Sequence, residues 1–242
     1  MHPRRLLPLL AVCAAAIAPT SALADQCVEA DSSQAFASVD GDTAYYTPAP
    51  GGGFEANGKA WTLTGAAATV AGNETLGIKS GSRALRLPLG STATSPEFCV
   101  DETKPHFRFA YKVDNAYFSG FLALVIYRDT DGEITNVELT SSKRVTALPT
   151  RWQASEASPL ATLLPLTGNG GETATVQIKF ISLIPADVID DLLTAIKGSN
   201  PLRDAIARAQ SIYQSTLAAW WSPYFNIGVT IDSVMVDPYR RG

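Results

Sequence analysis

The chain reads His-Phe-Arg-Phe-Ala-Tyr-Lys-Val from residue 106 to residue 113, and its aromatic and polar side chains alternate. Successive side chains of a β-strand point to opposite faces of the sheet, so this pattern predicts a strand with one buried face. We expect the buried face to consist of Phe107, Phe109, Tyr111 and Val113. The opposite face then carries His106, Arg108, Ala110 and Lys112.

Similar short runs, rich in β-branched and aromatic residues, recur along the chain and alternate with turn residues. Asp129-Thr130-Asp131-Gly132 is typical of a tight turn and predicts a β-hairpin. Regular strands separated by such turns predict a mostly β fold, a jelly-roll β-sandwich. The predicted strands are 60–64, 84–88, 98–101, 106–113, 121–128, 134–140, 174–182, 227–231 and 234–236.

Residues 185–221 break this pattern and predict an α-helical hairpin inserted near the C-terminus. Pro185 suits a helix start and Gly198 suits a helix end, while Asn200-Pro201 predicts the start of a second helix. Either the apolar stripe of the hairpin packs on the sandwich, or it forms a partner or lipid surface. The stripe comprises Val188, Ile189, Leu192, Leu193 and Ile196, then Leu202, Ala205, Ile206, Ala209, Tyr213, Leu217 and Trp220.

Residues 1–24 are predicted to be a signal peptide. Arg4 and Arg5 precede an apolar run, and Ala22-Leu23-Ala24 is a small-residue cleavage site. We therefore expect an exported, secreted chain without a membrane span. After the signal peptide, residues 25–53 are predicted to form an N-terminal extension with a Gly/Pro-rich turn. The β-sandwich domain is predicted over residues 54–242.

The charge balance argues against nucleic-acid binding. The 242 residues carry 19 Lys+Arg and 23 Asp+Glu, and removal of Arg4 and Arg5 with the signal peptide changes the net charge from −4 to −6. No basic footprint for a phosphate backbone results. Two cysteines remain, Cys27 and Cys99, and an even pair in an exported protein predicts a disulfide bond.

Two short motifs at opposite ends of the domain resemble a known family. The first motif is Phe54-Glu55 with Trp61, and the second is Ile231-Asp232-Ser233-Val234. They match the opening and closing motifs of the carbohydrate-binding-module-like jelly rolls, also called galactose-binding-like domains, which the chain resembles. A second resemblance is to exported actinobacterial proteins of unknown activity. It rests on 90–96, 99–100, 107–109 and 237–241.

The family resemblance implies a structural calcium ion held by Glu55 and Asp232. Calcium prefers several hard oxygen ligands, which carboxylates and carbonyls from two distant strands supply. The family has a second closing aspartate where this chain has Ser233. The alternative is that both carboxylates only accept hydrogen bonds from the backbone.

Strand alternation also predicts a polar, ligand-binding face. Its candidate residues are Arg108, Lys112, Tyr127, Gln177 and Lys179, if the polar faces of their strands coincide. A catalytic triad would have to use His106, the one histidine after the signal peptide, and the nucleophile-elbow motif Gly-x-Ser-x-Gly is absent.

These observations predict a non-enzymatic jelly-roll domain that binds glycan or cell-surface material. Two alternatives remain open at this point. One is a protein-interaction or structural module that works through the helical hairpin; the other is a polysaccharide-active enzyme, whose paired carboxylates would meet only in space. The sequence leaves the oligomeric state undetermined.

The predicted disulfide can be tested on the secreted protein. A bond between Cys27 and Cys99 closes a loop of about 70 residues and should stabilise the fold by roughly 4 kcal/mol. Non-reducing mass spectrometry of a tryptic digest should detect the linked peptides, and alkylation without reductant should leave both cysteines unmodified. Modification of both cysteines in the folded protein would contradict the pairing.

Overall fold

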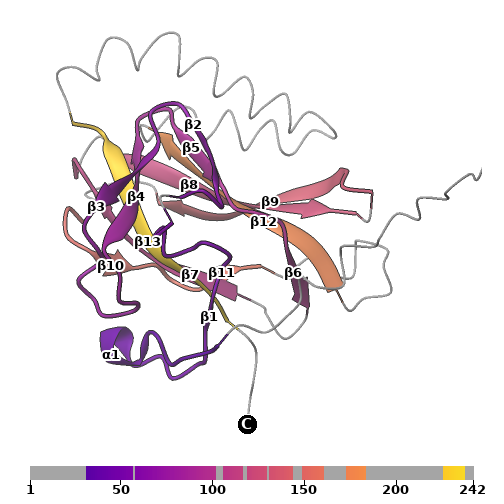
Figure 1. Cartoon of the computed structure of the whole chain (residues 1–242), viewed down its shortest axis with the longest axis horizontal. Helices are drawn as coiled ribbons and strands as arrows, with labels where there is room; N and C mark the ends of the chain where they lie inside the picture. Colours follow the sequence, from indigo (N-terminus) through magenta and orange to yellow (C-terminus); the bar gives the residue numbers. More distant parts are fainter. Residues whose placement is uncertain are drawn as a thin grey trace, which may run out of the picture.

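The computed structural model describes residues 31–56, 58–101, 106–116, 119–129, 131–143, 149–160, 173–183 and 226–237. These residues form two antiparallel sheets (Figure 1). The seven-stranded sheet consists of β1 (Thr47–Pro48), β3 (Ala68–Ala71), β4 (Arg83–Pro88), β7 (His106–Val113), β10 (Gln153–Ala154), β11 (Ser158–Pro159) and β13 (Gly228–Asp237). The six-stranded sheet consists of β2 (Thr62–Thr64), β5 (Thr92–Thr94), β6 (Phe98–Asp101), β8 (Gly120–Arg128), β9 (Ile134–Lys143) and β12 (Thr173–Leu183).

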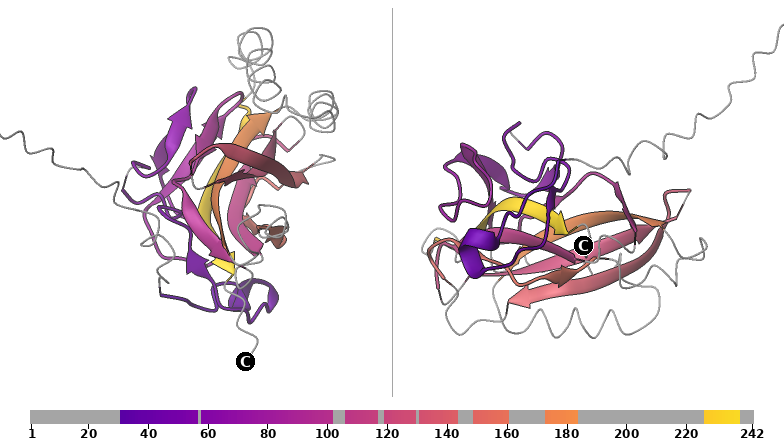
Figure 2. Two further views of the ribbon diagram at one scale, coloured as in Figure 1. Left: turned by 90° about the vertical axis from the view of Figure 1, so that its right-hand side faces the viewer. Right: turned by 90° about the horizontal axis from the view of Figure 1, so that it is seen from below.

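The chain repeatedly crosses between the sheets. Along the first sheet the order is β10-β7-β13-β4-β3, and along the second it is β2-β5-β12-β8-β9. β4 is followed by β5 and β6 in the other sheet, the chain returns for β7, crosses again for β8 and β9, and so continues to β13. This interleaving is the strand order of a jelly roll, and the side views in Figure 2 show the two sheets lying face to face.

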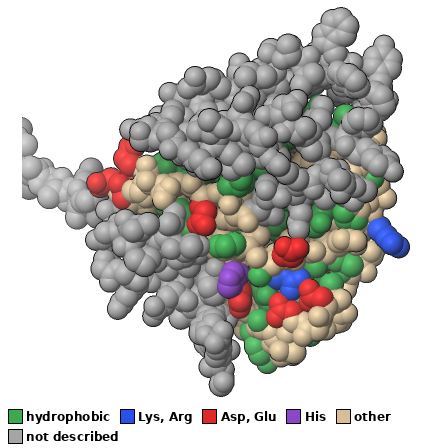
Figure 3. Space-filling model, turned by 180° about the vertical axis from the view of Figure 1, so that it is seen from behind, with side chains coloured by type: hydrophobic (Ala, Val, Ile, Leu, Met, Phe, Trp, Pro, Cys, Tyr) green, Lys and Arg blue, Asp and Glu red, His purple; other side chains and the backbone are tan. Residues whose placement is uncertain are grey.

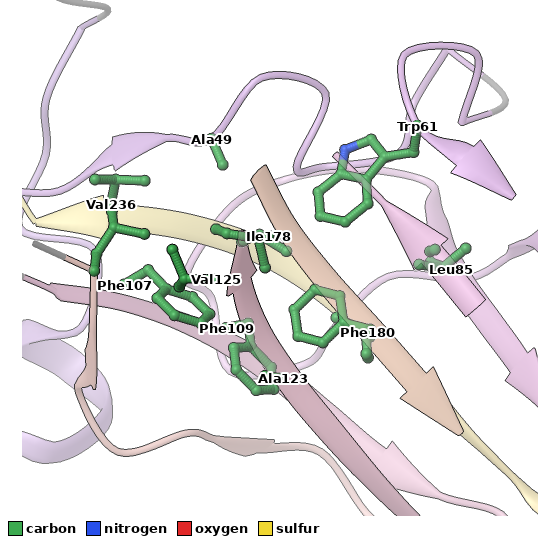
Figure 4. Packing of buried hydrophobic residues seen from close by; sticks show 14 of the residues in the cluster. Ala49, Trp61, Leu85, Phe107, Phe109, Ala123, Val125, Ile178, Phe180 and Val236 are labelled. Atoms are coloured by element: carbon green, nitrogen blue, oxygen red, sulfur yellow. The ribbon is translucent and has the colours of Figure 1, made fainter. Parts of the chain in front are cut away.

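The hydrophobic core lies between the sheets. The alternate residues Phe107, Phe109, Tyr111 and Val113 of β7 all face it, which confirms the predicted inward face. Figure 4 shows Phe107 and Phe109 meeting side chains from β8 and β12. The ring of Phe109 packs edge-on against that of Phe180, with centroids 4.9 Å apart. Trp61 stacks on the other side of Phe180 and donates a hydrogen bond from Nε1 to the carbonyl of Pro50 at 3.0 Å.

Strand β13 carries a β-bulge between Asp232 and Met235, so the two predicted strands 227–231 and 234–236 form one bent strand. Ser233 adopts a positive φ of 49° within the bulge. Beyond it, Val234 exchanges hydrogen bonds with the turn before Phe54: its N–H donates to Gly52 O at 3.0 Å, and its O accepts from Ala49 N at 2.9 Å. A side chain at Gly52 would collide with Val234 O, so this close approach requires glycine.

The N-terminal segment (residues 31–53) is an integral part of the sandwich. It contains the only described helix, α1 (Ala37–Asp40), and β1, which pairs with β13. The segment packs on the face of the seven-stranded sheet that points away from the core, which we call its outer face. A second hydrophobic cluster forms there from Ala35, Phe36, Tyr46, Ile78, Ala110 and Met235, with Trp152 at its margin. The segment thus adds β1 to the sheet and covers part of its outer face.

Arg108 fixes the N-terminal segment to the outer face. Its side chain is 6% exposed, and its guanidinium forms ion pairs with Asp40 and, at 2.7 Å, with Asp42. Its Nε donates to the carbonyl of Ser155 at 2.9 Å. The guanidinium carbon also lies 4.0 Å from the centre of the Phe36 ring, a cation–π contact.

These contacts shift the ionisation of both aspartates. The hydrogen bond from Arg108 is the largest influence on Asp40 and lowers the pKa of its carboxyl. Burial alone would raise the pKa of Asp42. Hydrogen bonds from Tyr46, Ala44 N and Arg108 together outweigh this effect, and the net pKa is lowered. Both carboxylates therefore favour the folded state while they are ionised.

Other sequence predictions meet the structure unevenly. The turn after β8 is confirmed, since Gly132 N donates to Asp129 O at 3.1 Å and Gly132 has a φ of 80°. The predicted strand 60–64 begins only at Thr62, and β3 and β5 were not predicted. The predicted helical hairpin at 185–221 and the signal peptide lie outside the described residues.

An Arg108→Ala variant should lose about 2–3 kcal/mol of unfolding free energy. The value lies below the cost of breaking a fully buried pair because Asp40 and Asp42 are partly exposed and regain water. Urea unfolding at pH 7 measures the loss, with exposed Arg151→Ala as the control, expected within about 0.5 kcal/mol of wild type.

The same variant should also respond differently to acid. The lowered aspartate pKa values stabilise the wild type above pH 4, and this stabilisation disappears as the pH falls below the unfolded value near 3.8 and through the folded values. The variant should show a shallower loss of stability between pH 4 and pH 2. Parallel acid profiles for the two proteins would contradict this role of Arg108.

Candidate functional site

The loop 73–83 surrounds the two carboxylates for which a calcium role is predicted. Phe54 adopts a φ of 57°, which sends its ring into the core beside Trp61 and leaves Glu55 at the surface. The Glu55 carboxylate accepts hydrogen bonds from Ser82 N at 2.8 Å, Ser82 Oγ at 2.8 Å and Arg83 N at 3.0 Å. These bonds, first among them the one from Ser82 N, lower the pKa of Glu55.

Asp232 reaches the same loop from the bulge of β13. Its Oδ2 accepts from Glu74 N at 2.9 Å and its Oδ1 from Ser233 N at 2.7 Å, and the residue is 1% exposed. Burial is the largest influence and raises the pKa of Asp232 to about 7, with further increases from the charges of Glu74 and Glu55. Asp232 is thus a buried acid whose ionised form is disfavoured.

Glu74 and Asn73 complete this oxygen-rich site, and the sequence analysis did not identify either. The Glu74 carboxylate is buried and accepts from the N–H groups of Leu76, Gly77 and Lys79. A Cβ at Gly81 would lie 2.3 Å from Glu55 Oε1 and 2.5 Å from Asn73 Oδ1, so these two oxygens converge beside the Gly81 backbone. In the sequence, the Gly and Asn residues between positions 72 and 82 indicate an irregular loop, and they were the available sign that this segment contributes to a site.

The ligand types at this site suit a hard cation such as calcium, because all of them are carboxylate or amide oxygens. Within the described ranges, however, no three His, Cys, Asp or Glu side chains are close enough together to hold a metal ion. Ser233 Oγ, beside Asp232, is buried and has no hydrogen-bond partner. The predicted pair therefore meets through one loop, where backbone N–H groups donate to both carboxylates and the Ser82 hydroxyl also donates to Glu55.

The five predicted ligand-binding residues do not form one surface. Lys112 and Arg108 lie on the outer face of the seven-stranded sheet, where Arg108 is occupied by the N-terminal segment. Gln177 and Lys179 lie on the outer face of the six-stranded sheet. Tyr127 points into the core, where its hydroxyl donates to Leu160 O at 3.1 Å. Alternation indicates the two sides of each strand, but it does not indicate which strands share a sheet.

On the six-stranded sheet, Gln177 belongs to a network near the end of β8. Its Oε1 accepts from Arg128 Nε at 2.9 Å, and its Nε2 donates to Ser95 O at 3.0 Å. The same Arg128 nitrogen lies 3.0 Å from Glu97 Oε1. Lys179 is half-buried, and burial lowers its pKa.

On the seven-stranded sheet, Trp152 and Lys112 form a half-exposed aromatic surface that we call the Trp152 platform. The Lys112 ammonium lies 4.9 Å from the centre of the Trp152 ring, and both side chains are half-buried. Thr230 of β13 pairs with Lys112 on one side and with Arg86 on the other, so the three residues form a row across the sheet.

A group of hydrogen-bonded side chains lies at the Arg86 end of this row. Arg86 donates to Asp114 Oδ2 at 2.7 Å and to the side-chain oxygen of Asn226 at 2.6 Å. A Cβ at Gly228 would lie 2.8 Å from the Asp114 carboxylate, so glycine there makes room for the acid. A different part of the surface is seen in Figure 3, where acidic side chains gather around a basic one close to the histidine.

Comparison with known proteins gives structural likenesses only. No family model and no curated protein matches the chain. Similar solved structures include the bacteriophage CBA120 tailspike protein 4, with 14% identity and a TM-score of 0.38 over 78% of this chain and 21% of that one. Another combines a family 22 carbohydrate-binding module with a xylanase from Clostridium thermocellum, with 15% identity and a TM-score of 0.43 over 81% of this chain and 28% of that one.

A third similar structure is a Stig cyclase from Fischerella, with 9% identity and a TM-score of 0.38 over 81% of this chain and 98% of that one. The chain thus spans under a third of the first two proteins and nearly all of the third. Carbohydrate-binding modules occur among these structures, as they do in the sequence resemblance. At such low identities and TM-scores, the likenesses assign no function.

Proposed function

We propose that the protein is an exported, non-catalytic jelly-roll module that binds glycan or cell-surface polymer on the Trp152 platform. The observation that carries this proposal is the partly exposed Trp152 ring in contact with Lys112, from which a row through Thr230 leads to the bonded group of Arg86, Asp114 and Asn226. Binding sites commonly combine an aromatic surface with a few fixed polar groups. A sugar ring offers matching chemistry, with an apolar face and a rim of hydroxyls.

The platform replaces most of the ligand-binding residues that the sequence analysis named. Lys112 remains, while Arg108 and Tyr127 are occupied inside the protein. Export is supported by the signal-peptide pattern of residues 1–24. Among the described residues, no helix is long and apolar enough to cross a membrane.

The glycan proposal predicts that Trp152→Ala loses binding. A panel of soluble xylo-, cello- and galacto-oligosaccharides and a glycan array would first identify a ligand for the wild type. Loss of the stacking surface should then weaken binding at least tenfold in calorimetry. Lys112→Ala should weaken it about threefold, because it removes the cation–π contact, worth roughly 0.5–1 kcal/mol, that helps to hold the Trp152 ring in place.

Two matched controls keep this experiment specific. Tyr45 is an exposed aromatic and Lys59 an exposed lysine, neither belongs to β4, β7, β10 or β13, and their alanine variants should bind like wild type. Melting curves establish that each variant is folded. Full binding by a folded Trp152→Ala variant, or no binding of any glycan by the wild type, would remove support for the proposal.

The proposed function includes a structural calcium ion bound near Glu55 and Asp232, with Asn73 and Glu74 close by. Support comes from the oxygen ligands that the 73–83 loop brings together and from a buried Asp232 that has only backbone N–H partners. A divalent cation would neutralise these mutually repelling carboxylates and link the start of the domain to its last strand. Its role would be to hold the loop in place.

Calcium should raise the melting temperature of the wild type. At a concentration a hundredfold above Kd, a ligand of the folded state adds roughly 2.7 kcal/mol, which corresponds to about 5–10 °C for a chain of this size. Scanning calorimetry with calcium and with chelator measures the difference. A Glu55→Gln, Asp232→Asn variant should melt at one temperature in both buffers, and identical wild-type curves in the two buffers would refute the site.

A further inference from the structure

The outer face of the six-stranded sheet carries an apolar surface centred on β8, with Gln177 and Lys179 of β12 beside it. On β8 the residues that alternate with the core-facing ones are Leu122, Leu124 and Ile126, and pairing places Ile181 of β12 opposite Leu122. Val137 of β9 lies opposite Ile126. All five side chains therefore project from the same side of the sheet, away from the core.

These side chains are nevertheless buried. Leu122 and Leu124 are 0% exposed, and Ile126 and Ile181 are 6% and 5% exposed. None of them belongs to the core between the sheets or to the cluster under the N-terminal segment. A solvated sheet face would carry polar residues at these positions, so the chain has a further apolar interface here.

The part of the chain between β12 and β13 begins and ends at one place. Ser182, near the end of β12, accepts a hydrogen bond at its O from Gly90 N at 3.0 Å. Ile227, just before β13, accepts one at its O from Leu89 N at 3.1 Å. Because Leu89 and Gly90 are consecutive, residues 184–225 leave and rejoin the described structure at adjacent points. This point is at the end of β12, directly beside the apolar face.

The sequence of this segment suits that face in size and in pattern. Its second predicted helix, from 201 to 221, would be about 30 Å long, which matches the length of the nine-residue strand β8, also about 30 Å. The apolar residues of both predicted helices recur at helical spacing and form one stripe. Among the long stretches between described strands, only this one carries such a stripe.

We infer that residues 184–225 dock their apolar stripe on the outer face of the six-stranded sheet, over Leu122, Leu124, Ile126 and Ile181. This interaction is independent of the proposed glycan site, which lies on the other sheet. It makes the outer face of the six-stranded sheet an internal interface.

Cysteine labelling tests the inference in the full chain. Leu124→Cys places a thiol on the apolar face, and Ile134→Cys places one at a 46% exposed position of the same sheet. With wild-type labelling subtracted, maleimide should modify Cys at 124 at least tenfold more slowly than Cys at 134. Adding Leu192→Asp and Leu193→Asp, which put charges on the stripe, should raise the rate at 124 at least tenfold and leave that at 134 unchanged.

Three results would overturn the inference. These are equal rates at 124 and 134, a slow rate at 124 that the stripe substitutions leave unchanged, and protection at 124 that disappears on dilution, which would identify a second copy as the occupant. If the combined variant fails to fold, hydrogen exchange decides. Leu124→Asp should increase exchange in residues 186–221 at least tenfold, whereas Ile134→Asp should not, and equal exchange in both variants would refute docking.

Discussion

The fold depends on the bulge in β13. This strand runs through the middle of the seven-stranded sheet, and it pairs with β4 only as far as Ile231 before the register against β7 shifts. Asp232 directly precedes the shift and points away from the core toward the 73–83 loop, and the extra residue of the bulge returns Val234 to the core side. It also lets Val234 bond to the turn before Phe54, so that the beginning of the domain is attached to its last strand.

On the outer face of the seven-stranded sheet, charged side chains are buried to different degrees at the two ends. At one end Arg108 is almost fully buried but has two carboxylates, a carbonyl and an aromatic ring as partners. At the other, Lys112 and Arg86 keep partial contact with water, and Lys112 lies over the partly exposed ring of Trp152. The first arrangement favours a fixed structural contact, and the second leaves polar groups available to an incoming molecule.

Strand positions could largely be predicted from the sequence, because alternation in β7 and β12 is strict and the residues on one side are large and apolar. Shorter strands such as β3 lack that contrast and were missed. The resemblance brought Glu55 and Asp232 to attention, but Glu74 contributes through a loop whose conformation depends on tertiary hydrogen bonds. Alternation likewise placed Arg108 correctly on the face opposite the core, yet nothing local indicated that the N-terminal segment would occupy it.

Leu89 and Gly90 hold the two ends of the segment between β12 and β13 next to each other, and this allows the segment to vary in length. When the two ends of a loop are already held together, the entropy of closing it grows only with the logarithm of its length, so replacing a six-residue connection by the 42 residues from 184 to 225 costs roughly 1.7 kcal/mol. A few buried apolar side chains outweigh that cost. The junction between β12 and β13 is therefore a position where a jelly roll can acquire, exchange or lose a whole subdomain while the order of its strands stays the same.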